Sequence, residues 1–109
     1  MKRPSDYLAA NLKVYFEHNQ ISTNGLANQS GIPQKTIWVC VTGSNAPSVN
    51  TAQLVCKSAR LSAPVLTLDE YTPGQLENSR AVEAIARELM RLDKSQLKFI
   101  KDMVDGLGK

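Results

Sequence analysis

Apolar residues recur along the chain at helical spacing, and few segments alternate as a strand would. Leu8, Leu12 and Phe16 follow one another every four residues after a polar start at Ser5. This spacing predicts a first amphipathic helix that is capped by the serine. The most apolar run, TIWVCV at residues 36–41, has no alternation and no hairpin partner, so it is a weak strand signal. The pattern therefore predicts an all-α chain.

Glycine and proline divide the next segment into short helices. A second helix is predicted to begin with Thr23 as its cap and to end at Gly31, because glycine takes the left-handed conformation past a helix end at little cost. Pro33 suits the first turn of a third helix over residues 34–42. The apolar face of this third helix has residues spaced i, i+3 and i+4: Ile37, Cys40 and Val41.

Two further short helices complete the first part of the chain. The loop GSNAPS at residues 43–48 precedes a fourth helix with a cap near Asn50, and a fifth helix is predicted within residues 61–68. These five helices are predicted to share one core. Its members are Leu8, Leu12, Phe16, Leu26, Ile37, Val41, Leu54 and Leu61.

After a break in the sequence DEYTPGQ, two longer amphipathic helices are predicted at about 77–92 and 94–107. The second opens with a potential capping box at residues 93–96, where Asp precedes Gln by three positions. We therefore expect one domain over residues 1–70, followed by a separate C-terminal helical region over residues 76–109.

Charge is unevenly distributed along the 109 residues, although the net charge is only +3. Residues 1–60 carry six basic and two acidic side chains, whereas residues 61–109 carry seven basic and eight acidic ones. The basic excess therefore lies in the part with the short helices, which is a modest indication of a polyanionic partner.

Several function classes find no support in the sequence. No run of about 18 apolar residues is present, and charged residues interrupt the N-terminal segment where a signal peptide would be apolar. We therefore expect a cytoplasmic protein that does not enter membranes. One histidine, and two cysteines (Cys40 and Cys56) in apolar surroundings, predict reduced core thiols and no metal site. No catalytic constellation is recognisable, so no enzyme, cofactor or small-molecule ligand is expected.

The second and third helices have the residue types that a helix-turn-helix requires. Ala27 is small enough for the next helix to approach, Gly31 allows the turn, Ile32 fills the corner and Ile37 packs the second helix onto the first. The polar face of residues 34–42 then points outward, and a helix of this size fits the major groove of B-DNA.

The segment TNGLANQSGIPQKTIWVCVTGSNAPSVNTAQLVCKSARLSAPVLTL resembles the helix-turn-helix domain of the phage repressor and Cro family. The resemblance covers about residues 6–70. It is carried by the combined spacing of Leu26-Ala27, Gly31-Ile32, Gln34, Thr36-Ile37, Gly43, Pro47-Ser48 and the run SARLS. The resemblance implies a five-helix, repressor-like DNA-binding domain.

The resemblance also implies base contacts from Gln34, Lys35, Trp38 and Val39. A glutamine amide can pair with adenine N6 and N7, and the alternative for Gln34 is a capping or solvated residue. Lys35 could reach guanine, a phosphate or only solvent. Trp38 could lie against thymine methyls or sugars, or fold back over Cys40. Val39 could touch a thymine methyl or belong partly to the core.

Contacts to the DNA backbone are implied for a second set, in which each residue could instead be an ordinary capping, packing or turn residue. This set is Thr23, Thr36, Thr42, Ser44 and Asn45. In the C-terminal pair, wide apolar stripes favour dimerisation, with folding back onto the first domain as the alternative. The residues expected at the dimer interface are Ile85, Leu89, Ile100, Met103 and Val104.

The sequence thus predicts a sequence-specific DNA-binding transcriptional regulator, of the kind found as phage or prophage repressors. It is expected to bind an inverted-repeat operator as a homodimer in the cytoplasm, in association with the nucleoid, since repressors of this class occupy half-sites about 34 Å apart. The alternative is an antitoxin-like autoregulator, whose C-terminal helices bind another protein.

Overall fold

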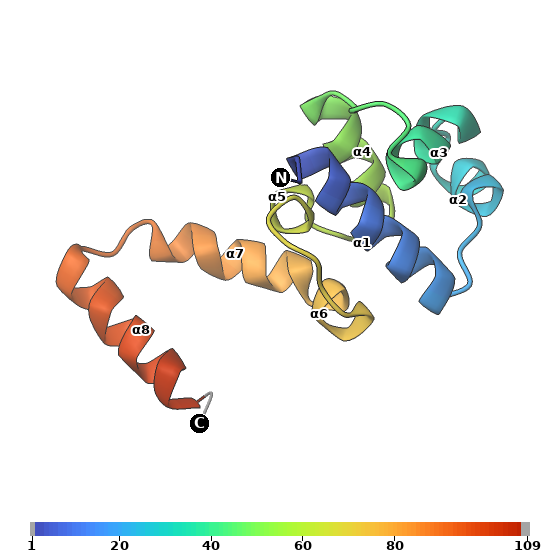
Figure 1. The fold of residues 1–109 in the computed structure, drawn as a ribbon. Helices are drawn as coiled ribbons and strands as arrows, with labels where there is room; N and C mark the ends of the chain where they lie inside the picture. Colours follow the sequence, from blue (N-terminus) through green and yellow to red (C-terminus); the bar gives the residue numbers. More distant parts are fainter. Residues whose placement is uncertain (1, 108–109) are drawn as a thin grey trace.

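The computed structural model describes residues 2–107, and within that range it is all-helical, as the sequence predicts. The first six helices along the chain form a body, and the last two extend from it as an arm (Figure 1). In chain order the helices are α1 (Pro4–His18), α2 (Thr23–Ser30), α3 (Gln34–Thr42), α4 (Val49–Ser58), α5 (Ala63–Leu66), α6 (Pro73–Glu77), α7 (Ser79–Leu89) and α8 (Lys94–Leu107).

Three helix starts differ from the sequence predictions by one to two residues. The first helix begins at Pro4 rather than after Ser5, because the Arg3 N–H donates to Asp6 Oδ2 at 2.8 Å and proline needs no donor in a first turn. Ser22 rather than Thr23 caps α2, accepting the Gly25 N–H at 2.8 Å. Ser48 rather than Asn50 caps α4, accepting a backbone N–H at 3.1 Å.

The core forms around α1, which packs against α3, α5 and α6. Seven of the eight predicted core residues are buried in it or, in the case of Val41, packed partly buried against it. The exception is Leu54, which is 54% exposed. The inward face of α4 is instead formed by residues spaced i, i+3, i+4 and i+7, which turns Leu54 outward. They are Ala52, Val55, Cys56 and Ala59.

The packed body continues past residue 70, so the boundary expected there falls inside it. Leu76, on α6, is fully buried in the core, and Ser79 at the start of α7 is also fully buried. The predicted break contains the start of α6, because Thr72 caps that helix and Pro73 occupies its first turn. The helix predicted over 77–92 corresponds to α7, which spans Ser79–Leu89, and α6 precedes it as a helix that the sequence did not predict.

A buried side chain on α1 fixes the connection between α5 and α6. The Asn11 amide donates to the carbonyl oxygens of Leu66 at 2.9 Å and Asp69 at 2.7 Å, and its oxygen accepts the Tyr71 N–H at 3.0 Å. Asn11 is 1% exposed, so these bonds replace water for all three backbone groups. They hold α6 where Leu76 can reach the core.

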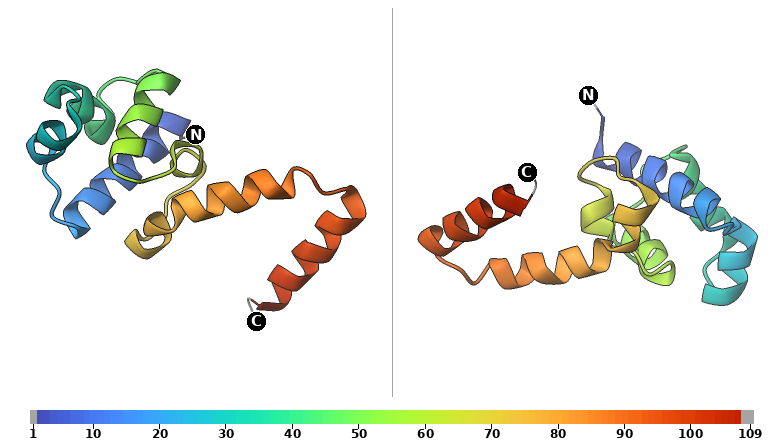
Figure 2. Two further views of the ribbon diagram at one scale, coloured as in Figure 1. Left: turned by 180° about the vertical axis from the view of Figure 1, so that it is seen from behind. Right: turned by 90° about the horizontal axis from the view of Figure 1, so that it is seen from below.

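The arm consists of α7, which leaves the body, and α8, which turns back at an angle to it (Figure 1, Figure 2). The predicted capping box between them is confirmed: Asp93 Oδ1 accepts the Gln96 N–H at 2.9 Å, and Gln96 Oε1 accepts the Asp93 N–H at 3.0 Å. The bond from Gln96 lowers the pKa of Asp93. No residue of α8 is buried. Within residues 2–107, no helix combines the length and apolar character needed to cross a membrane.

Candidate nucleic-acid interface

The two short helices α2 and α3 meet at a tight turn formed by residues 31–33. Gly31 has a φ of +77°, and its N–H donates to the Ala27 carbonyl at 2.9 Å, which ends α2. Ile32 is buried in the core directly after it. α3 then buries Ile37 and Cys40 against the body. The sequence correctly predicted the positions of the turn and of both buried residues.

The opposite side of α3 faces outward and carries the four residues predicted to contact bases. Gln34 and Lys35 are exposed, Trp38 is 47% exposed and Val39 is half-buried. Their spacing of i, i+1, i+4 and i+5 places them on one side of the helix. The structure therefore brings this predicted set together. Trp38 is neither fully buried over Cys40 nor fully free in solvent.

A hydrogen bond links the starts of α2 and α3. The Gln34 amide Nε2 donates to Thr23 Oγ1 at 3.0 Å. One residue is predicted to read a base and the other to contact a phosphate, and they are 11 positions apart in the sequence. The bond orients the Gln34 amide toward the first turn of α2.

The end of α3 gathers three more residues of the predicted backbone-contact set. The Thr42 hydroxyl donates to the Trp38 carbonyl at 2.9 Å, and the Ser44 N–H donates to the Thr42 oxygen at 3.4 Å. Ser44 and Asn45 are exposed in the loop that follows. Thr23 lies at the other end of this surface, and the half-buried Thr36 lies on α3. The predicted backbone contacts therefore flank the predicted base contacts.

A side chain at Gly43, which ends α3, would be in an unfavourable backbone conformation and in tight contact with α1. The φ of Gly43 is +68°, and a Cβ built on it would lie 3.1 Å from the Cβ of Ala9 on α1. Both the backbone conformation and the close approach to α1 therefore favour glycine. This residue fixes where the loop with Ser44 leaves the helix.

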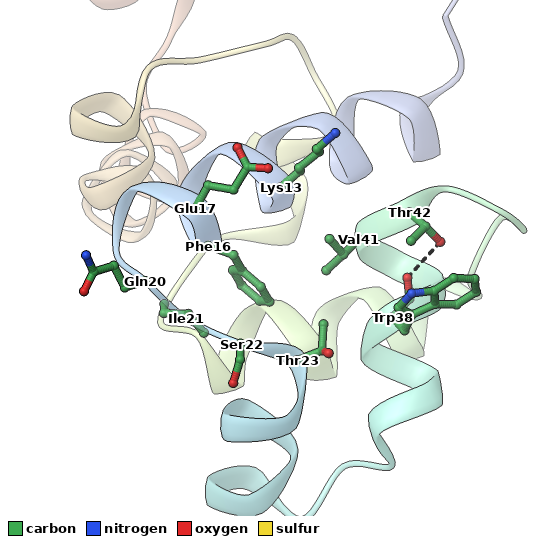
Figure 3. A pocket seen from close by; sticks show the side chains of 10 residues that line it. All are labelled: Lys13, Phe16, Glu17, Gln20, Ile21, Ser22, Thr23, Trp38, Val41 and Thr42. Atoms are coloured by element: carbon green, nitrogen blue, oxygen red, sulfur yellow. Dashed lines mark hydrogen bonds between the residues drawn. The ribbon is translucent and has the colours of Figure 1, made fainter.

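A concavity of about 620 Å³ lies between the end of α1, the start of α2 and the outer side of α3 (Figure 3). Phe16 and Val41 point into its floor, and Trp38 and Thr42 form one wall. Lys13 stands on the opposite wall, with Glu17 one turn further along α1. The sequence did not predict that Lys13 would lie beside α3, because that placement depends on how α1 packs.

One sequence signal for this surface was missed. No acidic residue occurs between Glu17 and Asp69, so α2, α3 and α4 carry no carboxylate. Lys35, Lys57 and Arg60 lie within the same stretch. Lys35 lies on α3 and Lys57 on α4, so a phosphate approaching these three helices would meet positive charges, amides and hydroxyls, without repulsion from an acid on them.

Both cysteines are free and buried, as the sequence predicted. Burial raises the pKa of Cys40, and it raises the pKa of Cys56 to about 12. The thiolate, which is the reactive form, is therefore scarce at neutral pH. Among residues 2–107, no group of three or more His, Cys, Asp or Glu side chains is placed to hold a metal ion.

The predicted dimer-interface residues lie on the arm, where their side chains remain uncovered. Ile85 on α7 and both Met103 and Val104 on α8 are more than half exposed, and Leu89 and Ile100 are partly buried. More large apolar side chains are exposed along the arm: Val82, Met90, Leu97, Phe99 and Leu107. The arm therefore carries many apolar side chains that the body does not bury.

Comparison of the chain with protein-family models, with curated proteins and with solved structures returned no match.

Proposed function

We propose that this protein is a sequence-specific DNA-binding transcriptional regulator in which α2 and α3 form a helix-turn-helix and α3 enters the major groove. The observation that carries the proposal is the outward side of α3, with Gln34, Lys35 and Trp38 exposed on helices that lack any carboxylate. An exposed amide and a cation at the start of a short helix are the groups that read base edges in this groove.

Phosphate contacts are proposed on both sides of α3. Thr23 stands in the first turn of α2, where free N–H groups and the helix dipole favour a phosphate. At the other end, Thr42 and Ser44 are exposed residues beside the Gly43 turn, and a phosphate there would replace the bond between the Ser44 N–H and the Thr42 oxygen. Lys13, across the concavity from Trp38, adds a positive charge that a phosphate on this side could approach.

Homodimerisation through α7 and α8 completes the proposal. An inverted-repeat operator presents two identical half-sites, which a two-fold dimer can occupy at the same time. The exposed apolar sides of α7 and α8 are the surfaces available for such an interface, and a second copy would remove them from water. Repression follows if the occupied operator overlaps a promoter.

Selection of bound duplexes from a random pool tests the proposed function. We expect an inverted repeat, whose binding weakens as salt increases because Lys and Arg contacts displace counterions. A mutated repeat with the same composition is the control. Equal affinity for all duplexes at about 0.15 M salt would refute sequence-specific regulation.

An antitoxin-like autoregulator is the second candidate, because α8 has no buried residue and its surface is equally available to a partner protein. In that case α8 would bind a different protein rather than a second copy. Expression of the chain with its neighbouring genes, followed by purification, separates the two candidates. A stoichiometric second polypeptide that is lost when Ile100 is replaced by Asp would favour the antitoxin-like candidate.

A further inference from the structure

Two serines and a carboxylate connect the start of α7 to the body. The Ser62 N–H donates to Ser79 Oγ at 3.0 Å, and the Ser62 hydroxyl donates to Glu83 Oε1 at 2.9 Å. Ser62 is 2% exposed and Ser79 is fully buried. We call Ser62, Ser79 and Glu83 the α5–α7 latch.

The latch holds α7 at two points. Ser79 and Glu83 are four positions apart, so they lie one turn from each other on the same side of α7. One attachment point would leave the helix free to pivot, whereas two points one turn apart resist a change in its direction. Leu76, in the core just before α7, supplies a third attachment. Because an unpartnered buried N–H is unfavourable, the Ser62–Ser79 bond resists opening.

The direction set by the latch reaches the exposed part of the arm. Ser79 and Leu89 belong to one uninterrupted helix, which spans about 15 Å at 1.5 Å per residue. A small rotation at Ser79 therefore moves the far end of α7 by several ångströms. Since α7 joins the body to α8, the latch controls where the body sits relative to the rest of the arm.

We infer that the α5–α7 latch sets the separation and orientation of the two DNA-binding bodies in the dimer, so that Ser79 and Glu83 determine which half-site spacing is preferred. The inference rests on the proposed function, because it concerns the same dimer and the same operator. Neither Ser79 nor Glu83 contacts DNA in the proposed complex. Both act as positioning residues, since they act through the direction of α7.

The chain offers matched variants around Glu83. Glu83→Ala removes the acceptor for Ser62, whereas Glu83→Gln keeps an amide oxygen in its place. Arg87→Ala removes only the ion pair between Arg87 and Glu83, which is 3.4 Å long and has a largely exposed arginine. Ser95→Ala removes a hydroxyl from the arm that bonds to Asp93, away from the latch.

A distance measurement tests the latch without DNA. Spin labels are attached to cysteines introduced by Asn24→Cys on α2 and Glu88→Cys on α7, in full-length chains diluted with unlabelled protein. The two native thiols are buried, and burial raises the pKa of both, which disfavours their labelling. We expect a narrow distance distribution, broadened by Glu83→Ala and restored by Glu83→Gln. The same narrow distribution with Glu83→Ala would overturn the inference.

A binding measurement tests the consequence for DNA. Affinities are compared for the selected repeat at its preferred spacing and for the same half-sites moved apart by about half a helical turn, roughly 5 bp. We expect Glu83→Ala and Ser79→Ala to reduce the ratio of the two affinities by about tenfold. This is a fraction of the ~10²–10⁴-fold gain in affinity that linking two sites can provide. Affinity for one isolated half-site should not change.

The outcomes separate the inference from the proposed function. If the wild-type protein selects no sequence, the proposed function fails, while the label distances still decide whether the latch fixes the arm. If the wild-type protein discriminates between spacings and folded Glu83→Ala discriminates equally well, the inference is overturned. Because Ser79→Ala leaves a buried N–H without its acceptor and can unfold the body, Glu83→Ala is the deciding variant.

Discussion

At the residue scale, Gln34 makes the most specific contribution to the proposed interface. Its amide is exposed at the start of α3 and is oriented by the 3.0 Å bond to Thr23. In the proposed complex this amide pairs with one base, so Gln34→Ala should weaken binding to the selected operator by about 1–3 kcal/mol and relax preference at one base pair. Affinities for operators with each base at that pair measure the effect.

Thr42→Ala is the matched control for this prediction. Thr42 lies at the opposite end of α3 from Gln34, and in the proposed complex it contacts only a phosphate. Its loss should weaken binding to selected and random duplexes alike. An unchanged base preference in Gln34→Ala would show that another residue reads the DNA.

Gly43 gives a residue-scale prediction about stability that does not depend on function. Gly43→Ala should destabilise the fold by about 1–2 kcal/mol or more, because its φ is +68° and the new Cβ would lie 3.1 Å from Ala9. Gly74→Ala is the control: Gly74 lies on α6 with open space around it, so alanine should be neutral or stabilise by about 0.4–1 kcal/mol.

Thermal unfolding of both glycine variants provides the measurement. A loss of 1 kcal/mol corresponds to a decrease in Tm of about 4–8 °C for a domain of 60–100 residues. Equal Tm values for Gly43→Ala and Gly74→Ala would contradict the close approach between the α3 turn and α1.

At the element scale, α8 is a helix whose packing surface is uncovered within one chain. Ile100→Asp places a charge among apolar residues of the proposed interface, so it should convert a dimer into a monomer without unfolding the body. Leu54→Asp makes the same change at an exposed apolar residue on α4. Sedimentation should show a dimer for Leu54→Asp and a monomer for Ile100→Asp.

A monomer for Leu54→Asp and a dimer for Ile100→Asp would place the dimer interface on α4. Two monomeric variants would show that both surfaces contribute. If Ile100→Asp and the wild-type protein sediment as the same species, α8 does not mediate self-association, and a different protein must cover it.

Local signals predicted most elements, because helix ends depend on nearby residues. The left-handed glycine at Gly31 and the capping box at residues 93–96 were recognisable in the sequence. The α6 helix was missed because Pro73-Gly74 looked like a break, although Thr72 caps the helix and proline is well tolerated in a first turn. The outward orientation of Leu54 was missed because it depends on which side of α4 packs against α3 and α5.

The candidate interface, like the helices, was predictable from the sequence only where local spacing determines it. Helical periodicity alone placed Gln34, Lys35 and Trp38 on one side of α3. Tertiary packing was needed to place Lys13 across the concavity and to bond Gln34 to Thr23, since neither follows from spacing in the sequence. The sequence therefore predicted the members of one helix face and not the neighbours contributed by other helices.

At the scale of the whole molecule, the body and the arm meet at the start of α7. A chain ending at residue 90 keeps Leu76, Ser79 and Glu83, so it should remain folded and lose dimerisation. A chain ending at residue 75 loses a fully buried leucine, a change that costs about 2–5 kcal/mol when a core leucine becomes alanine. Against a total stability of about 5–15 kcal/mol, this loss is severe.

Circular dichroism during heating compares the two truncations. The shorter chain should unfold at a much lower temperature, and the longer one close to the full-length protein. Equal unfolding temperatures would mean that the five helices before residue 70 form a complete core, as the sequence alone predicted.

The three hydrogen bonds of Asn11 have a consequence for the order of events during synthesis. This residue is made early, yet its partners at Leu66, Asp69 and Tyr71 are made 55 to 60 residues later. During translation, the Asn11 amide on α1 therefore lacks its hydrogen-bond partners until the segment between α5 and α6 has been made. Domains fold as units as they emerge during translation, so nascent chains that stop before residue 71 should be cut readily by a protease, and chains that continue through α7 should resist.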